Sequence, residues 1–343
     1  MLIKKFPEDF IVEEIPDFEI VEQGEYAVYR LKKTNLNTEH AIELVCEILR
    51  TSRSSINYAG TKDKNAVSTQ YISIHKNKGK SGIERPNLHM EFVGFCEEPL
   101  SLGSLKGNKF QITVRELSDD EKKIFEKNMN SGSKIPNYFD EQRFSQNNLE
   151  IGISIIKKDF KKASELIQES FGHNENFVRT HLEKDQKDYV GAIRMMPKKI
   201  LSMYIHSVQS YLYNHALSEL LKEYASLKNI AYKEIPYSNG QMIFYQRPED
   251  YKQVPVDGLQ LVGFDTTILS RYIAEKLKEL QIEQRDFIIR ALPDMSVEGS
   301  TRKCFVDIEY FSFEYIDEKT LKLSFNLPKG SYATIFIKAL FSK

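Results

Sequence analysis

The sequence predicts an α+β protein from two observations. Alternating apolar residues, typical of strands, dominate the first third of the chain and its end. Apolar residues spaced three and four apart, typical of helices, dominate the middle. Strands grouped at both ends of a helical middle favour an α+β fold in which the two ends share one sheet.

The first third predicts a strand, a helix and two further strands. Residues 26–32 alternate as a strand does, and residues 38–53 then carry one apolar face, as a helix does. Residues 69–74 and 110–116 are short β-type segments, with apolar and polar side chains alternating in the second.

The middle predicts helices. Helical periodicity appears at 119–130, at 149–169 and at 198–219, where the last segment has a continuous apolar stripe. The final stretch, residues 321–341, is strand-like on both sides of a Pro-Lys-Gly turn. We expect these C-terminal strands to return to the N-terminal sheet and the helical middle to be an insertion.

Length and charge set the domain count and limit the partners. The 343 residues predict about two domains, which we place at residues 1–150 with 300–343 and at residues 151–299. Lys and Arg total 48 against 49 Asp and Glu, so the net charge of -1 gives no bulk attraction to a polyanion.

Three segments are nevertheless locally basic: residues 75–85, 157–162 and 194–199. Any one of them alone predicts a solvated lysine surface. Together they favour a track for a phosphate backbone, because each neutralised phosphate releases counterions.

The positions of the cysteines and histidines argue against a disulfide-linked fold and against a metal site. Cys46, Cys96 and Cys304 lie far apart, which favours a reducing compartment, and the seven histidines lack ligand spacing, so we expect no metal. The N-terminus lacks the apolar core of a secretory signal, and no apolar run approaches the ~20 residues that cross a bilayer. We expect a cytoplasmic protein without a membrane partner.

Common cofactor motifs are missing from the sequence, which has no GxxxxGK[ST], no GxGxxG after a strand and no GxSxG. In the turn at 56–70, Gly60 permits an unusual backbone conformation, and Asp63 lies between Lys62 and Lys64, whose charges favour its ionised form. From pattern alone this is more often a plain surface turn, and Phe139 further along is more often a core residue.

Six ordered segments resemble the TruD family of tRNA pseudouridine synthases. The turn GTKDKNAVSTQ is similar to the family pattern GxKDxxAxTxQ. The other five are EDFIVEE (8–14), GSLKGNKFQITVR (103–115), NYFDEQRFS (137–145), IHSVQSYLYN (205–214) and FNLPKGSYATIFIKAL (325–340). The chain departs from the pattern at Asp140 and Ser145, where the family has glycine, and at Lys338, where it has arginine.

The resemblance implies a catalytic domain with a mixed, largely antiparallel sheet, a mostly helical α/β insertion domain, and isomerisation of a tRNA uridine, at position 13 in bacterial members, to pseudouridine. This reaction breaks the N1–C1′ bond and joins C1′ to C5 of the same base, without a cofactor. It needs an ionised carboxylate, either as a nucleophile at C1′ or as a base that removes a ribose proton. Asp63 is the candidate for either role.

The resemblance also implies roles for binding residues. The target uridine must leave its stack at a cost of a few kcal/mol, and Phe139 would stack on the everted base while Asn137 bonds nearby. Lys62 would hold Asp63 anionic or contact a phosphate. Glu14 would position these residues without touching the substrate itself.

Two residues of the predicted helix at 198–219 complete the expected substrate site. Gln209 and Asn214 lie off its apolar stripe, and their amides could serve structural hydrogen bonds or bind RNA equally well. The basic segments 157–162 and 194–199 would line an RNA-binding cleft. We expect a monomer whose partner is tRNA and which uses no nucleotide cofactor.

Two other functions stay open from the sequence. An RNA chaperone on the same fold would refold tRNA without needing Asp63. An RNA methyltransferase would need S-adenosylmethionine, and no glycine-rich loop after a strand supports it.

Overall fold

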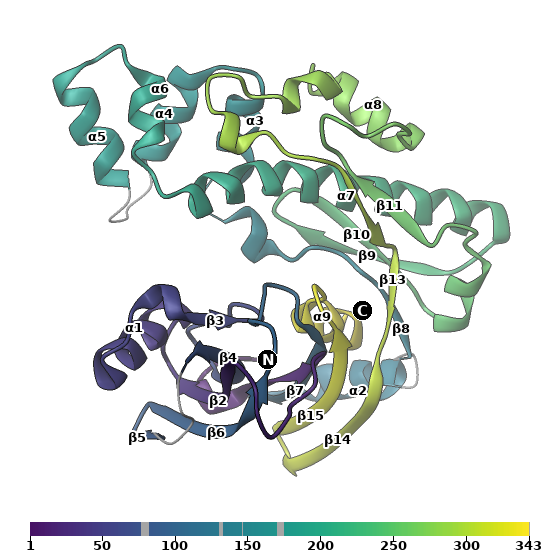
Figure 1. Ribbon diagram of the computed structural model, residues 1–343. Coiled ribbons are helices and arrows are strands. Elements are labelled where there is room, and N and C mark those ends of the chain that lie inside the picture. Colours follow the sequence, from purple (N-terminus) through teal and green to yellow (C-terminus); the bar gives the residue numbers. More distant parts are fainter. Residues whose placement is uncertain (77–81, 130–132, 146, 170–174, 343) are drawn as a thin grey trace. The chain divides into compact units, whose positions relative to one another are not determined.

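The computed structural model describes residues 1–76, 82–129, 133–145, 147–169 and 175–342 (Figure 1). The chain forms two compact units. The first contains Met1–Ser133 and Asp307–Ala333, and the second contains Lys134–Val306 and Thr334–Lys343. The functional domains assigned above stay a prediction, and Lys78 and Lys80 of the first basic segment lie outside the described residues.

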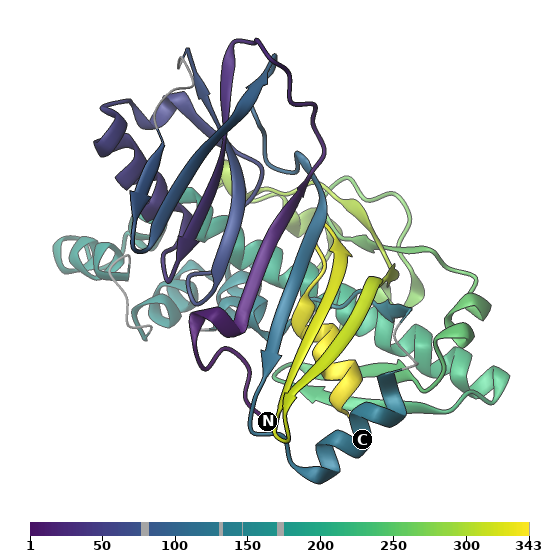
Figure 2. The ribbon, with the colours of Figure 1, turned by 90° about the horizontal axis from the view of Figure 1, so that it is seen from below.

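A mixed nine-stranded sheet forms the first unit (Figure 2). Its order is β14-β15-β7-β1-β4-β2-β6-β5, with β3 beside β4. The pair β1 and β4 is parallel, and the other pairs are antiparallel. The strands are β1 (Phe10–Pro16), β2 (Tyr26–Thr34), β3 (Ile56–Tyr58), β4 (Val67–His75), β5 (Ile83–Arg85), β6 (Leu88–Cys96), β7 (Leu105–Val114), β14 (Glu309–Asp317) and β15 (Thr320–Pro328).

The two ends of the chain share this sheet, which confirms the α+β prediction. Strand β15 pairs with β7 from Leu321 opposite Val114 to Pro328 opposite Gly107. The strand predicted beyond the Pro-Lys-Gly turn is wrong, because residues there form helix α9 (Ala333–Phe341). The apolar residues of α9 recur at helical spacing, which outweighs the strand propensity of its isoleucines.

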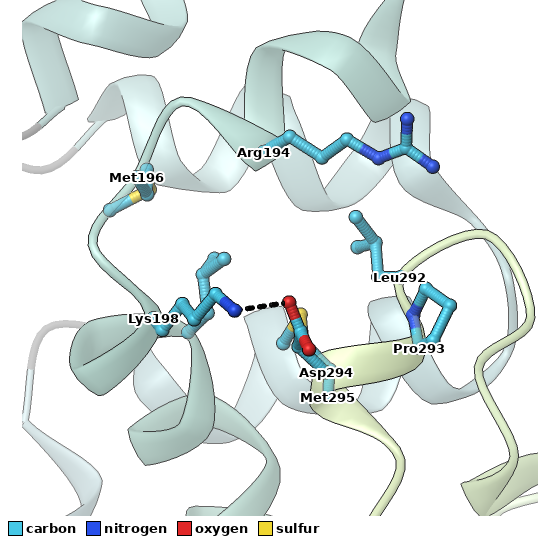
Figure 3. A pocket seen from close by; sticks show the side chains of 8 residues that line it. Arg194, Met196, Lys198, Leu292, Pro293, Asp294 and Met295 are labelled. Carbon is cyan, nitrogen blue, oxygen red and sulfur yellow. Dashed lines mark ion pairs between the residues drawn. The ribbon is translucent and has the colours of Figure 1, made fainter.

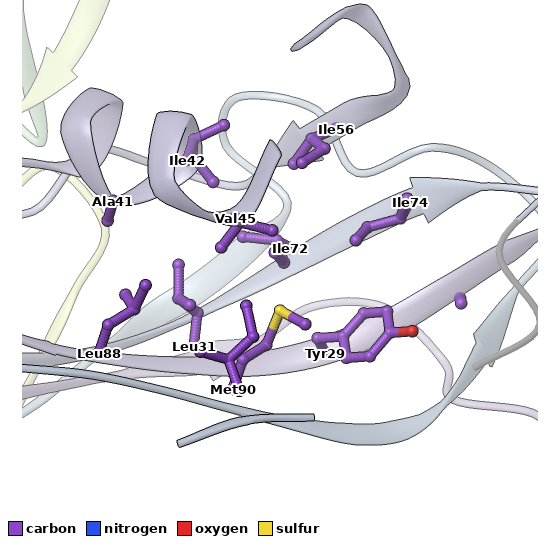
Figure 4. Packing of buried hydrophobic residues seen from close by; sticks show 12 residues of the cluster. Tyr29, Leu31, Ala41, Ile42, Val45, Ile56, Ile72, Ile74, Leu88 and Met90 are labelled. Atoms are coloured by element: carbon purple, nitrogen blue, oxygen red, sulfur yellow. The ribbon is translucent and has the colours of Figure 1, made fainter. Parts of the chain in front are cut away.

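Helix α1 (Thr38–Leu49) covers one face of the sheet over β2, β4 and β6 (Figure 4). It begins at Asn37, whose side chain accepts a hydrogen bond from the His40 N–H, and it ends at Arg50 in the left-handed conformation. Its buried side chains pack onto Leu31 and Ile72. The second helix of this unit is α2 (Asp119–Asn128).

The second unit is mostly helical, as predicted. Its helices are α3 (Asn148–Ile156), α4 (Phe160–Glu169), α5 (Glu175–Lys184), α6 (Tyr189–Arg194), α7 (Lys198–Lys228) and α8 (Arg271–Glu279), and most of α9 joins them. Its strands pair as β9 (Tyr232–Tyr237) with β10 (Gly240–Tyr245), β11 (Gly258–Leu261) with β12 (Ser300–Lys303), and β8 (Lys134–Pro136) with β13 (Phe305–Asp307).

Helix α7 is the centre of the second unit and packs against α3, α8, β10 and β11. It continues nine residues beyond the predicted end at 219, to Lys228. The helix predicted over 149–169 is instead two helices, because Lys158 adopts a left-handed conformation and the Asp159 side chain then accepts a hydrogen bond from the Lys162 N–H in the first turn of α4. Gly152 lets α3 approach α7 closely, since a Cβ there would lie 2.2 Å from the Tyr204 carbonyl oxygen.

Candidate active site

The topology of the sheet brings three chain segments to one edge. Strands β1 and β4 are parallel, with Ile11 opposite Val67, so the residues that precede them lie side by side. Strand β2 runs antiparallel to β4 and ends there, with Thr34 opposite Val67. The segment before β1, the end of β2 and the loop before β4, residues 59–66, therefore meet. This loop carries Asp63.

Side chains from α1 and β4 hold the Asp63 loop in place. The Lys62 N–H donates to Thr38 Oγ1 at 2.9 Å, and that hydroxyl donates to Gln70 Oε1 at 3.1 Å. Gln70 Nε2 in turn donates to the Gly60 carbonyl at 3.1 Å. Gly60 itself has no positive φ and space for a Cβ, so its expected conformational freedom is not used here.

The cation that contacts the Asp63 carboxylate comes from the start of the chain. Lys4 Nζ lies 2.8 Å from Asp63 Oδ2, and it also lies 4.0 Å from the centre of the Phe10 ring. The Asp63 side chain is 36% exposed, and its Oδ1 accepts no hydrogen bond from the described parts of the chain. One carboxylate oxygen of Asp63 is thus paired with an ammonium group, whereas the other has no hydrogen-bond partner among the described residues.

Lys33 binds the backbone of the same loop from inside the protein. It is fully buried, and its Nζ donates to the carbonyl oxygens of Asp63 at 2.9 Å, Lys62 at 3.3 Å and Leu36 at 2.6 Å. Burial lowers the pKa of Lys33 to about 8, although the nearby charge of Asp63 opposes that shift. Lys33 fixes the main chain at Asp63, whereas Lys4 contacts its side chain.

Glu14 and Lys62 form a buried ion pair behind the loop. Lys62 Nζ lies 2.5 Å from Glu14 Oε1, and the two side chains are 8% and 1% exposed. Glu14 Oε2 accepts a hydrogen bond from the Tyr71 N–H at 2.8 Å. Burial raises the pKa of Glu14, and the ion pair with Lys62 opposes that shift. The ammonium of Lys62 is therefore committed to Glu14, and it is Lys4 that contacts Asp63.

Asn137 lies in the second unit and is bonded on both sides of its amide. Its Oδ1 accepts from Arg302 Nη2 at 2.7 Å, and its Nδ2 donates to the Lys303 carbonyl at 3.1 Å. Arg302 Nε also donates to the Asn137 carbonyl at 3.0 Å. Strand β12, which contains Arg302 and Lys303, thus fixes the position of this side chain.

Phe139 lies beside Asn137 in the same unit and contacts a cation and an aromatic ring. The Arg302 guanidinium carbon lies 4.1 Å from the centre of its ring, and Tyr213 packs edge-on at 5.6 Å. Asn214 holds the backbone of Phe139, accepting from its N–H at 2.9 Å and donating to its carbonyl at 2.8 Å. Phe139 is 6% exposed.

Gln209 is bonded elsewhere on α7. Its Nε2 donates to the Val262 carbonyl at 2.8 Å and to the Glu298 carbonyl at 3.3 Å. The structural hydrogen bonds considered for Gln209 and Asn214 are therefore present, and their contact with RNA stays a prediction.

Asp140 and Lys338, two residues that differ from the family pattern, form an ion pair. Lys338 Nζ lies 2.8 Å from Asp140 Oδ1, which ties α9 to the residue after Phe139. Burial alone would raise the pKa of Asp140, but hydrogen bonds from Lys338 and Thr334 outweigh it and lower that pKa. The charged residue at 140 thus has a charged partner where the pattern has glycine.

The residues predicted from sequence form one group in each unit. Asp63, Lys62 and Glu14 lie together in the first, and Asn137, Phe139 and Asn214 in the second, with Gln209 further along α7. Sequence reasoning missed Lys4, Lys33 and Arg302. Their type and spacing carry no signal, because only the folding of each unit brings them beside the predicted residues of that unit.

The described residues contain no helix long and apolar enough to cross a membrane. They also contain no cluster of three or more His, Cys, Asp or Glu side chains with the geometry of a metal site.

Comparison with known proteins gives consistent matches over the whole chain. The family model for tRNA pseudouridine synthase D (TruD) matches residues 1–180 and 161–340. A protein of Methanococcus maripaludis named "Probable tRNA pseudouridine synthase D 1" is 30% identical over 100% of both chains, and the "Probable tRNA pseudouridine synthase D" of Archaeoglobus fulgidus is 31% identical over 98% of this chain and 93% of its own. A crystal structure from Methanosarcina mazei that carries the TruD name has a TM-score of 0.69 and 27% identity, covering 99% of this chain and 93% of that one.

Proposed function

Because the chain belongs to the tRNA pseudouridine synthase D (TruD) family, a family of isomerases, we propose that it converts a uridine of tRNA to pseudouridine with Asp63 as the essential group. The observation that carries this proposal is the Asp63 carboxylate itself. It stands on a loop whose backbone is anchored by Thr38 and Lys33, with Lys4 on one oxygen and no hydrogen bond from the described residues to the other.

The chemistry requires a carboxylate that is ionised and fixed. The N1–C1′ bond breaks, C1′ joins C5, the proton on C5 leaves to solvent and N1 gains a proton, so the reaction needs no outside electrons. Asp63 either attacks C1′ or removes a ribose proton, and Lys4 Nζ pairs with one of its two carboxylate oxygens. Preorganised charge of this kind costs no reorganisation during the reaction.

The everted uracil needs a partner that offsets the loss of its stack, and we assign this to Phe139 and Asn137. Base–aromatic stacking contributes about 1–3 kcal/mol, the same order as the cost of unstacking. Asn214 supports the proposal by holding the Phe139 backbone in place through two hydrogen bonds. Asn137 Nδ2 uses one of its two N–H groups on the Lys303 carbonyl, so the second can donate to a uracil oxygen.

We assign Gln209, Asn214, Glu14 and Lys62 to positioning roles around these groups. Each uses its side-chain amide or charge on a protein partner at 2.5–2.9 Å. The family resemblance favours position 13 of tRNA as the target, and the proposed tRNA substrate favours a cytoplasmic location.

Tritium release from tRNA labelled at C5 of uridine tests the proposal. We expect the purified protein to release tritium without added metal or nucleotide, and Asp63→Asn to abolish release while tRNA binding stays within a few-fold. Chemical mapping of pseudouridine in the product identifies the target position. Turnover by Asp63→Asn would remove Asp63 from the mechanism, and no release from any uridine by the wild type would refute the proposed function.

A further inference from the structure

A pocket of about 250 Å³ opens in the second unit, where the connector between α6 and α7 meets the 3-10 turn η7 (Pro293–Met295) (Figure 3). Part of its lining, Arg194, Met196 and Lys198, comes from the predicted basic segment 194–199, and the rest comes from other parts of the second unit. The residues that line it are Arg194, Met196, Lys198, Leu201, Leu292, Pro293, Asp294 and Met295.

The pocket has an apolar floor of fixed shape. Met196, Leu201, Leu292 and Met295 are each 2–4% exposed, so packing beneath the pocket holds them in place. Thioether and aliphatic groups of this kind suit a flat, largely apolar ring. A surface that only followed a phosphate backbone would not need such a floor.

The rim of the pocket carries two cations and one acid. The Arg194 side chain runs along one side of the pocket (Figure 3), and its Nη2 donates to the Ala291 carbonyl at 2.7 Å, which leaves the other N–H groups of the guanidinium without a hydrogen bond to the described residues. Lys198 Nζ lies 2.7 Å from Asp294 Oδ2, and both side chains are largely exposed. The lining thus carries one net positive charge at the point where Lys198 begins α7, and the first turn of that helix contains no acidic residue.

We propose that this pocket binds one nucleotide of the tRNA other than the target uridine, with the base on the apolar floor and the phosphate on Arg194 and Lys198. The proposal rests on the proposed function, because the substrate RNA is the source of nucleotides that such an enzyme meets. Asp294 competes with the phosphate for Lys198. The pocket therefore contributes to selection of tRNA and not to the chemical step.

Methyl NMR of the full-length wild-type protein tests occupancy directly. Met196 and Met295 line the floor, and their labelled methyl resonances can be assigned with Met196→Leu and Met295→Leu. We expect both resonances to shift on addition of tRNA and, at higher concentration, of uridine monophosphate, but not of inorganic phosphate. Three results would overturn the proposal. Shifts with the mononucleotide but not with tRNA would show a site for free nucleotides, and equal shifts with inorganic phosphate would show that the pocket does not bind the base. The absence of any shift with tRNA would exclude binding of the RNA.

Kinetics test the two cations separately from the chemistry. We expect Lys198→Met and Arg194→Gln each to raise the KM for tRNA about tenfold while kcat changes little, because each variant removes a contact to the phosphate. Asp294→Asn should lower KM, because it removes the competing carboxylate. The matched control is Lys228→Met, which removes an exposed lysine at the other end of α7, about 45 Å along the helix.

Unchanged KM in both cation variants would overturn the pocket proposal. Failure of the proposed function would look different: the wild type would release no tritium, and the NMR shifts would still report whether RNA enters the pocket.

Discussion

Replacing Lys33 by methionine tests whether the backbone of the Asp63 loop must be held for activity. Lys33→Met keeps the length of the side chain but removes all three hydrogen bonds to carbonyl oxygens. Two of those acceptors, the carbonyls of Lys62 and Asp63, belong to the loop. We expect the loop to lose its fixed position while the sheet beneath it stays folded.

The structure sets the expected size of the effect. A hydrogen bond from a charged donor contributes about 1.5–3 kcal/mol. The contact with the Asp63 carbonyl is 2.9 Å and that with the Lys62 carbonyl is longer at 3.3 Å, so the loop loses about 3 kcal/mol in all. At about 1.4 kcal/mol per factor of ten, kcat should fall roughly 100-fold. Global stability should change less, because methionine also removes the cost of burying a charge.

The pKa of Lys33 adds a pH signature. Burial lowers this pKa to about 8, against the charge of Asp63 and together with that of Lys62. Above that pH the ammonium loses a donor, so wild-type kcat should decline, whereas the low kcat of Lys33→Met should be flat. The free energy of unfolding should change in the opposite direction. Between pH 8 and the ordinary lysine pKa of 10.5, Lys33 binds more protons in the unfolded chain than in the folded one, so its contribution to the free energy of unfolding rises with pH.

Single-turnover tritium release, measured on both sides of that pKa, is the assay. The matched control is Lys32→Met, which removes the exposed neighbouring lysine on β2 and should leave kcat and its pH profile unchanged. A kcat for Lys33→Met within a few-fold of wild type would refute the reasoning. An alkaline decline that persists in Lys33→Met would assign that decline to another group, such as the uridine itself.

Three further predictions concern stability, each measured by urea unfolding of the full chain followed through its tyrosines. Glu14→Gln leaves the buried Lys62 ammonium without its counter-ion and should cost about 3–5 kcal/mol, much of it recovered by adding Lys62→Met; equal stability of the single and double variants would contradict this. Asp140→Gly and Lys338→Met should show a coupling free energy of about 1 kcal/mol in a double-mutant cycle. This coupling should disappear as the pH falls through the lowered pKa of Asp140, because the carboxylate is then protonated, and additive effects of the two substitutions would contradict it. Gly152→Ala should cost about 1–3 kcal/mol, because the new methyl group would lie 2.2 Å from a backbone carbonyl of α7, and wild-type stability would show that the two helices can separate without cost.

Local periodicity was sufficient for the elements whose side chains sort onto two faces. The predicted strands at 26–32, 69–74 and 110–116 lie within β2, β4 and β7 apart from the last residues at 115–116, and the return of the C-terminal strand to the N-terminal sheet is confirmed. Errors occurred where local signals were ambiguous. The apolar run at 333–341 fits a strand by residue type and a helix by spacing, and the break at Lys158 depends on a left-handed residue that no glycine marks.

The order of residues along the chain, by itself, determined the fold class and the membership of Asp63, Phe139 and Asn137 in a recognisable set of motifs. Only the tertiary structure decided which charges meet. Lys62, adjacent to Asp63 in sequence, pairs with Glu14, whereas Lys4, 59 residues away, contacts Asp63. The reason is physical: adjacent residues in an extended loop point their side chains in different directions, and an ion pair forms between whichever charges the pairing of β1, β2 and β4 brings within a few ångströms.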